Sequence, residues 1–221
     1  TGERRLTERG RQLARLPIDP RLARMLLAAR EHGCVRELLI LTSALSLQDV
    51  RERPGEFQQA SDEKHRRFHE PDSDFLALIK LWRHVETERA QLSESRMRKL
   101  CRDEFLSYVR LREWRELHQQ LLMHIKELGF PLNEQPAEYE AIHRALLTGL
   151  LGQIGNKTAD GDYLGGRNIR FHIFPASSLF RKGPKWLMAG ELAETSRLYA
   201  RLCARVEPEW VEQAAGELVK R

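Results

Sequence analysis

The chain has 221 residues, of which 41% are apolar, and a formal net charge of +5. This length permits one large domain or two to three small ones, and no apolar run approaches the roughly 20 residues that cross a bilayer. The opening residues, Thr1-Gly2-Glu3-Arg4-Arg5, are not followed by the apolar stretch of a signal peptide, so secretion and membrane insertion are both disfavoured.

The cysteines indicate a reducing compartment. Cys34, Cys101 and Cys203 are odd in number and far apart, and each lies in an apolar or amphipathic segment. Neither a disulfide framework nor a CxxC zinc site can be built from them within one chain. We therefore expect a cytoplasmic protein.

Amphipathic helices are expected at the start of the chain. Thr7 is a helix N-cap candidate for a short first helix. The Asp19-Pro20 pair predicts the start of a second, because Asp can cap free amides and Pro at the first helical position has no amide to leave unpaired. Gly33 ends it, and residues 34–47 are so densely apolar that they indicate a buried helix.

The middle of the chain continues this helical pattern. A basic loop at residues 51–55 precedes a polar helix through residues 64–68, and Asp72-Ser73-Asp74 predicts the N-cap of a helix running to about Glu88. Residues 87–99 are polar and indicate a loop or a frayed extension of that helix.

Apolar positions from Phe105 to Leu128 then mark two helices or one interrupted helix, ending at Gly129. Trp82, Trp114 and Trp210 lie on apolar stripes and are expected in the core.

The pattern changes after a last helix that carries Ile142, Leu146 and Leu150. Asp160-Gly161-Asp162 predicts a hairpin turn, and strand-like alternation follows in three segments. These segments are residues 169–173, 186–192 and 198–206. The third, taken alone, is equally compatible with a helix, and Pro208 opens a terminal helix.

Positive charge is concentrated in this strand-rich part. Residues 141–206 carry ten Lys or Arg against four Asp or Glu, whereas residues 1–140 carry 25 against 24. A small basic β-barrel with this charge suits an extended polyanion as its partner.

Basic and hydroxyl side chains near the predicted turns are the candidates for nucleic-acid contact, because long cations there reach a phosphate backbone without being buried. A solvated surface is the alternative for the cations, and capping of a short helix is the alternative for Ser177 and its neighbour Ser178. The candidates are Lys157, Arg167, Arg170, Ser177, Arg181, Lys182 and Lys185.

A second basic group lies in the third strand segment, where Arg197, Arg201 and Arg205 share one predicted face with Tyr199. This face either lines a groove or covers the outside of the sheet.

No catalytic or metal site is predicted. His65 and His69 lie four residues apart, but no Glu lies between them as in an HExxH motif, and no third ligand is evident. Asp72 and Asp74 lie at a helix start, which favours capping over a catalytic pair of carboxylates. The sequence contains neither GxxxxGK[ST] nor Asp-Glu-Ala-His, so we expect no ATP hydrolysis and no cofactor in this chain.

Several segments match a recurring series of short motifs. The opening LTERGRQLARLPIDPRLARMLLAA follows T-x-x-G…P-x-D/E-P…L-A-K/R-M-L, and residues 68–75 keep F-x-x-x-D-x-D. Residues 105–121 are similar to F-L-x-Y…R-x-Q-L, with His118 in place of Arg. HIFPASSLF is similar to an H-P-S-S turn, with Phe174 before the proline and Ala176 inserted, and residues 207–211 are close to x-P-E-W-L. In this order the motifs resemble the region downstream of the motor in DEAH-box RNA helicases, and especially their bacterial HrpA-type members.

The resemblance implies a mainly α fold with a C-terminal β-barrel. Residues 1–18 would be the end of a winged-helix domain, residues 19–135 a helical ratchet-like domain, and residues 136–221 an OB-fold with flanking helices. It also favours a strand for residues 198–206.

The resemblance further implies a function as a nucleic-acid-binding accessory region. Such a region grips and guides single-stranded RNA while RecA-like motor domains of the same parent chain supply translocation with ATP and Mg²⁺. The sequence does not distinguish RNA from DNA. A docking module for a protein activator or a ribonucleoprotein is the alternative, and no membrane partner is expected.

Overall fold

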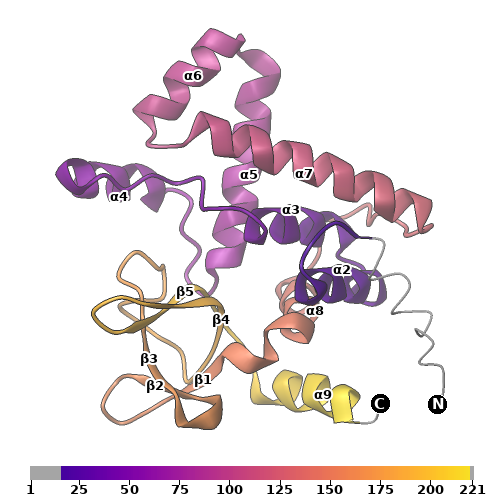
Figure 1. The fold of residues 1–221 in the computed structure, drawn as a ribbon, viewed down its shortest axis with the longest axis vertical. Coiled ribbons are helices and arrows are strands. Elements are labelled where there is room, and N and C mark those ends of the chain that lie inside the picture. The colour runs from indigo at the N-terminus through magenta and orange to yellow at the C-terminus, as the bar shows by residue number, and fades with distance from the viewer. Residues whose placement is uncertain (1–15, 220–221) are drawn as a thin grey trace, which may run out of the picture.

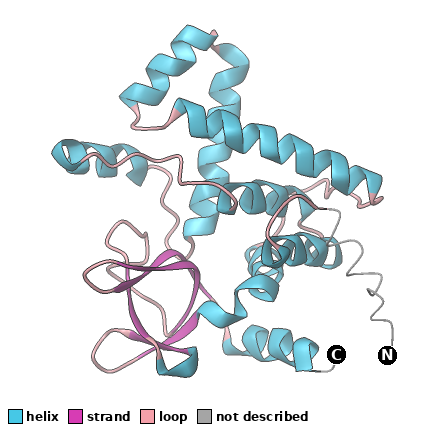
Figure 2. Ribbon diagram, viewed as in Figure 1, coloured by secondary structure: helices cyan, strands magenta, loops and turns pink. Residues whose placement is uncertain are grey.

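We describe a computed structural model of the chain, which defines residues 16–219. Helices make up the first part, and a closed five-stranded barrel follows (Figures 1 and 2). The predicted fold class, mainly α with a C-terminal barrel, is confirmed. The helix predicted at Thr7, with most of the segment assigned to a winged helix, lies outside the described residues.

Seven α-helices of the described chain precede the barrel. They are α2 (Pro20–His32), α3 (Val35–Leu45), α4 (Gln58–Arg66), α5 (Asp74–Gln91), α6 (Glu94–Asp103), α7 (Tyr108–Glu127) and α8 (Tyr139–Leu150). The predicted start of α2 is confirmed, because the Asp19 carboxylate accepts a hydrogen bond from the Arg21 amide at 2.8 Å and Pro20 is the first helical residue. Helix α3 is buried, as its apolar density predicts.

Of the two alternatives predicted for residues 87–99, the loop is wrong, and an extension of the preceding helix is correct only as far as Gln91. Helix α5 continues to Gln91, and after a short break α6 covers residues 94–103. Only Met97 and Cys101 of α6 are buried, so the apolar pattern was too sparse to reveal a helix. Helix α7 is continuous, and α5, α6 and α7 extend away from the barrel (Figure 1).

The barrel contains five strands in the described chain, in the closed order β1-β2-β3-β5-β4. They are β1 (Ile154–Lys157), β2 (Tyr163–Gly165), β3 (Arg170–Ile173), β4 (Trp186–Glu194) and β5 (Leu198–Arg205), followed by helix α9 (Pro208–Val219). Strands β3 and β5 are parallel and the other pairs are antiparallel. The predicted hairpin turn is confirmed, with Gly161 at φ +86° between β1 and β2. The ambiguous segment 198–206 is a strand over residues 198–205.

The strict alternation of side chains between two faces, predicted for residues 198–206, is wrong from Leu202 onward. This residue has φ +55°, in the left-handed region, which interrupts the alternation of inward and outward side chains. Ala200 and Cys203 therefore both lie in the barrel interior, whereas Leu202 and Ala204 pack against the helical core. Gly190 lies opposite, and a Cβ there would approach the Leu202 Cβ to 3.1 Å.

Two apolar cores hold these elements together. The larger one joins the helices, and a smaller one, which includes Tyr163 and Phe171, fills the barrel. The larger core crosses the predicted domain boundary at residue 135, because buried side chains of α8 belong to it. The buried Glu37 carboxylate of α3 fixes the connection before α8, since it accepts from the Asn133 amide group at 2.9 Å. The exact domain limits stay a prediction.

Helices α5 and α8 meet through a buried serine and histidine. The Ser73 hydroxyl caps α5 by accepting from the Leu76 amide at 3.2 Å, and it lies 2.7 Å from His143 Nε2. His143 Nδ1 lies 2.6 Å from the Tyr139 carbonyl oxygen. Because a carbonyl only accepts, Nδ1 carries the proton, and Nε2 accepts from the Ser73 hydroxyl. Burial lowers the pKa of His143 to about 4, so the ring is neutral at pH 7.

A loss of stability in acid follows from His143. Its pKa rises from about 4 in the folded chain to an ordinary value of 6.5 on unfolding, so the unfolded state binds more protons between these values. The stabilisation by the neutral ring is fully present above pH 6.5 and is lost as the pH falls toward 4. In His143→Gln, which keeps a donor and an acceptor but does not titrate, we expect the urea midpoint to fall less between pH 7 and about pH 4.5.

The control is His124→Gln, at a partly exposed ring of α7. It should keep the pH dependence of the unmodified chain. An equal fall of the midpoint in His143→Gln and in the unmodified chain would contradict the assignment.

Candidate nucleic-acid interface

A large open cleft lies between the helical part and the barrel. Its volume is about 1960 Å³. One side is formed by α2, by residues 44–53 and by α4, and the other by the loop of residues 174–181 with parts of β4 and β5. Elements far apart in the sequence thus face a common space.

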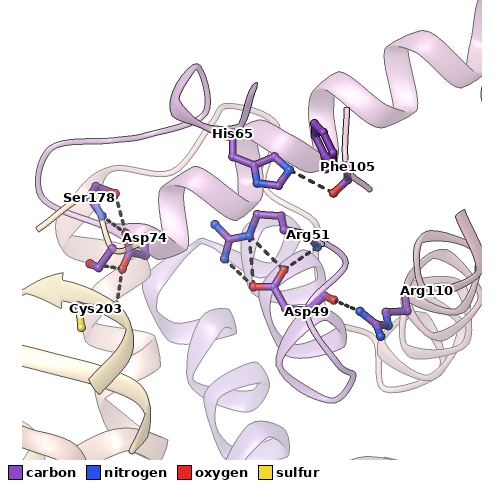
Figure 3. Close-up of polar contacts among 9 residues, drawn as sticks. Asp49, Arg51, His65, Asp74, Phe105, Arg110, Ser178 and Cys203 are labelled. Carbon is purple, nitrogen blue, oxygen red and sulfur yellow. Dashed lines mark hydrogen bonds and ion pairs between the residues drawn. The ribbon is translucent and has the colours of Figure 1, made fainter. Parts of the chain in front are cut away.

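Asp74 lines this cleft and joins its two sides (Figure 3). Asp74 is only 5% exposed, and its carboxylate accepts four hydrogen bonds from the barrel. Oδ1 accepts from the Ser178 amide at 2.9 Å and hydroxyl at 2.6 Å, and Oδ2 accepts from the Ser177 hydroxyl at 2.5 Å and the Cys203 amide at 2.9 Å. The prediction that Asp74 serves as a helix cap is therefore wrong, because Ser73 caps α5 and Asp74 binds the barrel.

The residues beside Asp74 strengthen the same junction. The Arg205 amide donates to the Asp72 carbonyl oxygen at 2.9 Å. The Tyr139 hydroxyl lies 2.8 Å from that oxygen and 2.8 Å from the Arg205 carbonyl oxygen. Residues 72–74 are thus bonded to α8, to β5 and to the barrel turn that contains Ser177 and Ser178, which we call the serine turn.

On the helical side of the cleft, the segment around Arg51 is fixed by the loop before α7 and by Arg110 of α7, which Figure 3 shows bonded to Asp49. The Glu52 amide donates to the Phe105 carbonyl oxygen at 2.8 Å, and Arg110 Nη1 donates to the Asp49 carbonyl oxygen at 3.0 Å. Arg51 Nη2 lies 2.7 Å from the Asp49 carboxylate. Burial alone would raise the pKa of Asp49. The charge of Arg51 and its hydrogen bonds to the carboxylate have the larger effect, so the pKa of Asp49 is lowered and the pair stays ionised.

His65 holds the segment around Arg51 against the loop before α7. Its Nε2 lies 3.0 Å from the Glu104 carbonyl oxygen and 3.2 Å from that of Phe105, so it must donate. Burial, with the charge of Arg51, lowers the pKa of His65. Among the described residues, no group of three or more His, Cys, Asp or Glu side chains is arranged to hold a metal ion.

Arginine is the main source of positive charge in the cleft, and it is partly neutralised. Three of the lining arginines pair with a carboxylate, in Arg21–Asp19, Arg51–Asp49 and Arg53–Asp62. Within residues 16–219, Arg66 and Arg181 are exposed and pair with no carboxylate. These two come from opposite sides of the cleft, and both can reach a ligand without breaking an ion pair.

The structure divides the predicted site residues into two groups. Ser177 and Arg181 line the cleft, and the Ser177 hydroxyl donates to Asp74. The other five are exposed on turns or strand ends of the barrel and do not line it: Lys157, Arg167, Arg170, Lys182 and Lys185. The seven residues are therefore not one cluster.

Two of the barrel-turn cations already have partners. Lys157 Nζ donates to the Gly183 carbonyl oxygen at 3.2 Å. Arg170 pairs with Asp162 at 3.1 Å, so a phosphate there would compete with a carboxylate.

The predicted common face holds for Tyr199 and Arg201, since the Tyr199 ring lies 5.8 Å from the Phe174 ring and Arg201 lies over that ring at 4.7 Å. It is wrong for Arg205, which lies 5.9 Å from the Tyr139 ring, beyond the irregular Leu202. Phe174 and Phe180, which were not among the predicted site residues, both line the cleft. An apolar residue in a polar turn was the available signal for Phe180, and no sequence signal linked Arg66 to the barrel.

Two family models match the chain. One, described as helicase associated domain (HA2), ratchet-like, matches residues 19–78, and the other, described as oligonucleotide/oligosaccharide-binding (OB)-fold, matches residues 142–218. The chain is 59% identical over 218 residues to the ATP-dependent RNA helicase HrpA of Escherichia coli, covering 98% of the chain and 17% of that protein. The chain is therefore similar to the ratchet-like and OB-fold region of the HrpA-type helicases, as the sequence motifs indicated.

Other relatives match over the same extent. The HrpA homolog of Haemophilus influenzae is 53% identical over 223 residues, with 100% of the chain and 17% of the relative covered. The pre-mRNA-splicing factor ATP-dependent RNA helicase prp22 of Schizosaccharomyces pombe is 27% identical over 217 residues, with 97% and 18% covered. The chain thus spans less than a fifth of the length of these relatives. No helix among the described residues is long and apolar enough to cross a membrane.

Asp74 lies inside the matched ratchet-like segment, and its four donors lie inside the matched OB-fold. One buried carboxylate therefore connects the two matched regions of the chain.

Substitution of Asp74 tests this connection. In Asp74→Asn, one carboxylate oxygen becomes an amide group that faces donors, so buried donors lose their acceptor. We expect the free energy of unfolding to fall by about 3 to 5 kcal/mol, measured by urea denaturation at neutral pH.

Asp72→Asn is the matched control, two residues away and with a side chain 56% exposed. It should cost at most about 1 kcal/mol. Equal losses in the two variants would show that the Asp74 carboxylate does not hold the barrel.

Proposed function

We propose that this chain is a nucleic-acid-binding accessory region of an ATP-dependent RNA helicase, and that it holds and guides single-stranded RNA in the cleft between its helical and barrel parts. The observation that carries the proposal is two exposed arginines that line the cleft, Arg66 from α4 and Arg181 from the barrel, neither of which pairs with a carboxylate within residues 16–219. Cations on both sides attract a phosphate backbone without regard to sequence.

The barrel turns would extend this contact beyond the cleft. Arg167, Lys182 and Lys185 are exposed, and within the described chain none of them pairs with a carboxylate. Lys157 and Arg170 would contribute only by exchanging their present partners for phosphate. Ser177 would have to release Asp74, so we place it last among the candidates.

The proposed division of labour follows from what the sequence contains. It has neither GxxxxGK[ST] nor Asp-Glu-Ala-His, the motifs of an ATP-driven motor. We therefore assign ATP and Mg²⁺ to RecA-like domains of the parent protein, which would pull the strand. The present region would keep that strand from leaving the channel.

The salt dependence of binding tests the proposal. If three or four phosphates are engaged, the logarithm of the association constant for single-stranded RNA should fall with the logarithm of salt concentration, with a slope of about −2 to −3. In Arg181→Ala the slope should become shallower by about 0.7, because one phosphate contact is lost. Fluorescence anisotropy with labelled RNA, and in parallel with single-stranded DNA, measures both.

The matched control is Arg112→Ala, at an arginine of α7 whose side chain is 61% exposed and outside the cleft. It should leave the slope unchanged. A flat salt response of the unmodified chain would overturn the proposal, and a protein partner whose recovery resists nuclease would favour a docking module instead.

A further inference from the structure

Phe180 is an exposed aromatic side chain at the edge of the cleft. Six large apolar side chains of the described chain are exposed, and Phe180 is the one among them that lines the cleft, with half of its surface in contact with solvent. A single exposed apolar side chain is ordinary on a protein surface. Its surroundings decide what it can do.

The backbone that carries Phe180 is held rigidly. Ser177 and Ser178, just before it, are bonded to the buried Asp74 carboxylate. The Phe180 amide donates to the Ser177 carbonyl oxygen at 3.2 Å, and the neighbouring Leu179 is 1% exposed in the barrel core. The ring therefore stands on a fixed turn, and little conformational entropy remains to be lost when a ligand stacks on it.

Cations accompany the aromatic rings of the cleft. Arg181 follows Phe180 directly, lines the cleft and, within residues 16–219, pairs with no carboxylate. In the same cleft, Arg201 lies 4.7 Å over Phe174. Arg201 Nε is buried and has no hydrogen-bond partner in the described chain.

Rings beside cations suit single-stranded nucleic acid. Every base has a flat face that stacks on an aromatic ring, while the neighbouring cation holds the phosphate. In a duplex the base faces are already stacked on one another, so they cannot serve this contact except at an end.

We propose that Phe180 is a base-stacking platform of the cleft and that it selects strands with unpaired, unstacked bases. The inference rests on the proposed function, since it names the class of strand that the cleft accepts. Arg181 supplies the charge contact and Phe180 the base contact.

Substitutions of Phe180 test this assignment in the full chain with a short labelled single-stranded RNA. Phe180→Ala should weaken binding by about 5- to 100-fold, the range expected for one lost stacking contact. Phe180→Trp keeps a ring and should bind like the unmodified chain. Phe180→Leu keeps apolar volume without a ring and should lose as much affinity as Phe180→Ala.

Two further readouts separate stacking from other roles. The slope of affinity against salt should be the same in Phe180→Ala and in the unmodified chain, because no phosphate contact is lost. An RNA with abasic sites should bind the unmodified chain as weakly as intact RNA binds Phe180→Ala. Thermal unfolding confirms that each variant is folded. We expect each variant to fold, because the Phe180 ring is half exposed and its replacement leaves the core intact.

The outcomes distinguish this inference from the proposed function. If the unmodified chain binds no single-stranded RNA, the proposed function fails. If it binds with the expected salt slope and Phe180→Ala binds equally well, only the stacking assignment is overturned. Full RNA affinity in Phe180→Leu would also overturn it, since the side chain would then serve only as an apolar contact. A Phe180→Ala variant that binds RNA normally but no longer captures a protein partner would overturn it as well.

Discussion

The buried carboxylate of Asp74 is the interaction on which the rest of this structure depends. Removing a carboxylate from water is costly, and the cost is offset only when both oxygens are well bonded. Here each oxygen accepts two hydrogen bonds, from the serine turn at residues 177–178 and from Cys203 of β5. Because these donors come from two separate parts of the barrel, the barrel is fixed in position and orientation on the first turn of α5.

This connection explains an irregularity that is unfavourable in isolation. Leu202 adopts a left-handed conformation, which costs free energy for a residue with a branched side chain. The next amide, that of Cys203, donates to Asp74, and the Leu202 side chain packs against the helical core. The strain in β5 is thus compensated at the contact between the two parts. A rigid contact of this kind keeps the two sides of the cleft at a constant separation, as the proposed function of guiding a strand requires.

Features that depend on nearby residues were predictable from the sequence. Asp19 and Pro20 begin α2, and the glycine turn at Asp160-Gly161-Asp162 connects β1 to β2, because caps and turns are decided within a few residues. The strand identity of residues 198–205 needed the family resemblance, since alternation in a short apolar segment also fits a buried helix.

Features that depend on distant partners were not predictable. The role of Asp74 is set by donors more than 100 residues away in the sequence, so its place at a helix start suggested only a cap. The same limit applies to the cleft, because Arg66 and Arg181 line a common cleft only in the folded chain. Charge counting found the basic barrel but not the pairing of Arg170 with Asp162, which reduces its availability.

The most direct test of this account is a distance measurement between spin labels on the two sides of the cleft. Cys34, Cys101 and Cys203 are buried, so labels can be directed to new cysteines at the exposed Glu63 of α4 and Glu194 of β4. The account predicts one narrow distance distribution in the chain with Asp74 intact, and a broad one after Asp74→Asn. A broad distribution with Asp74 intact would contradict the claim that its buried carboxylate fixes the cleft.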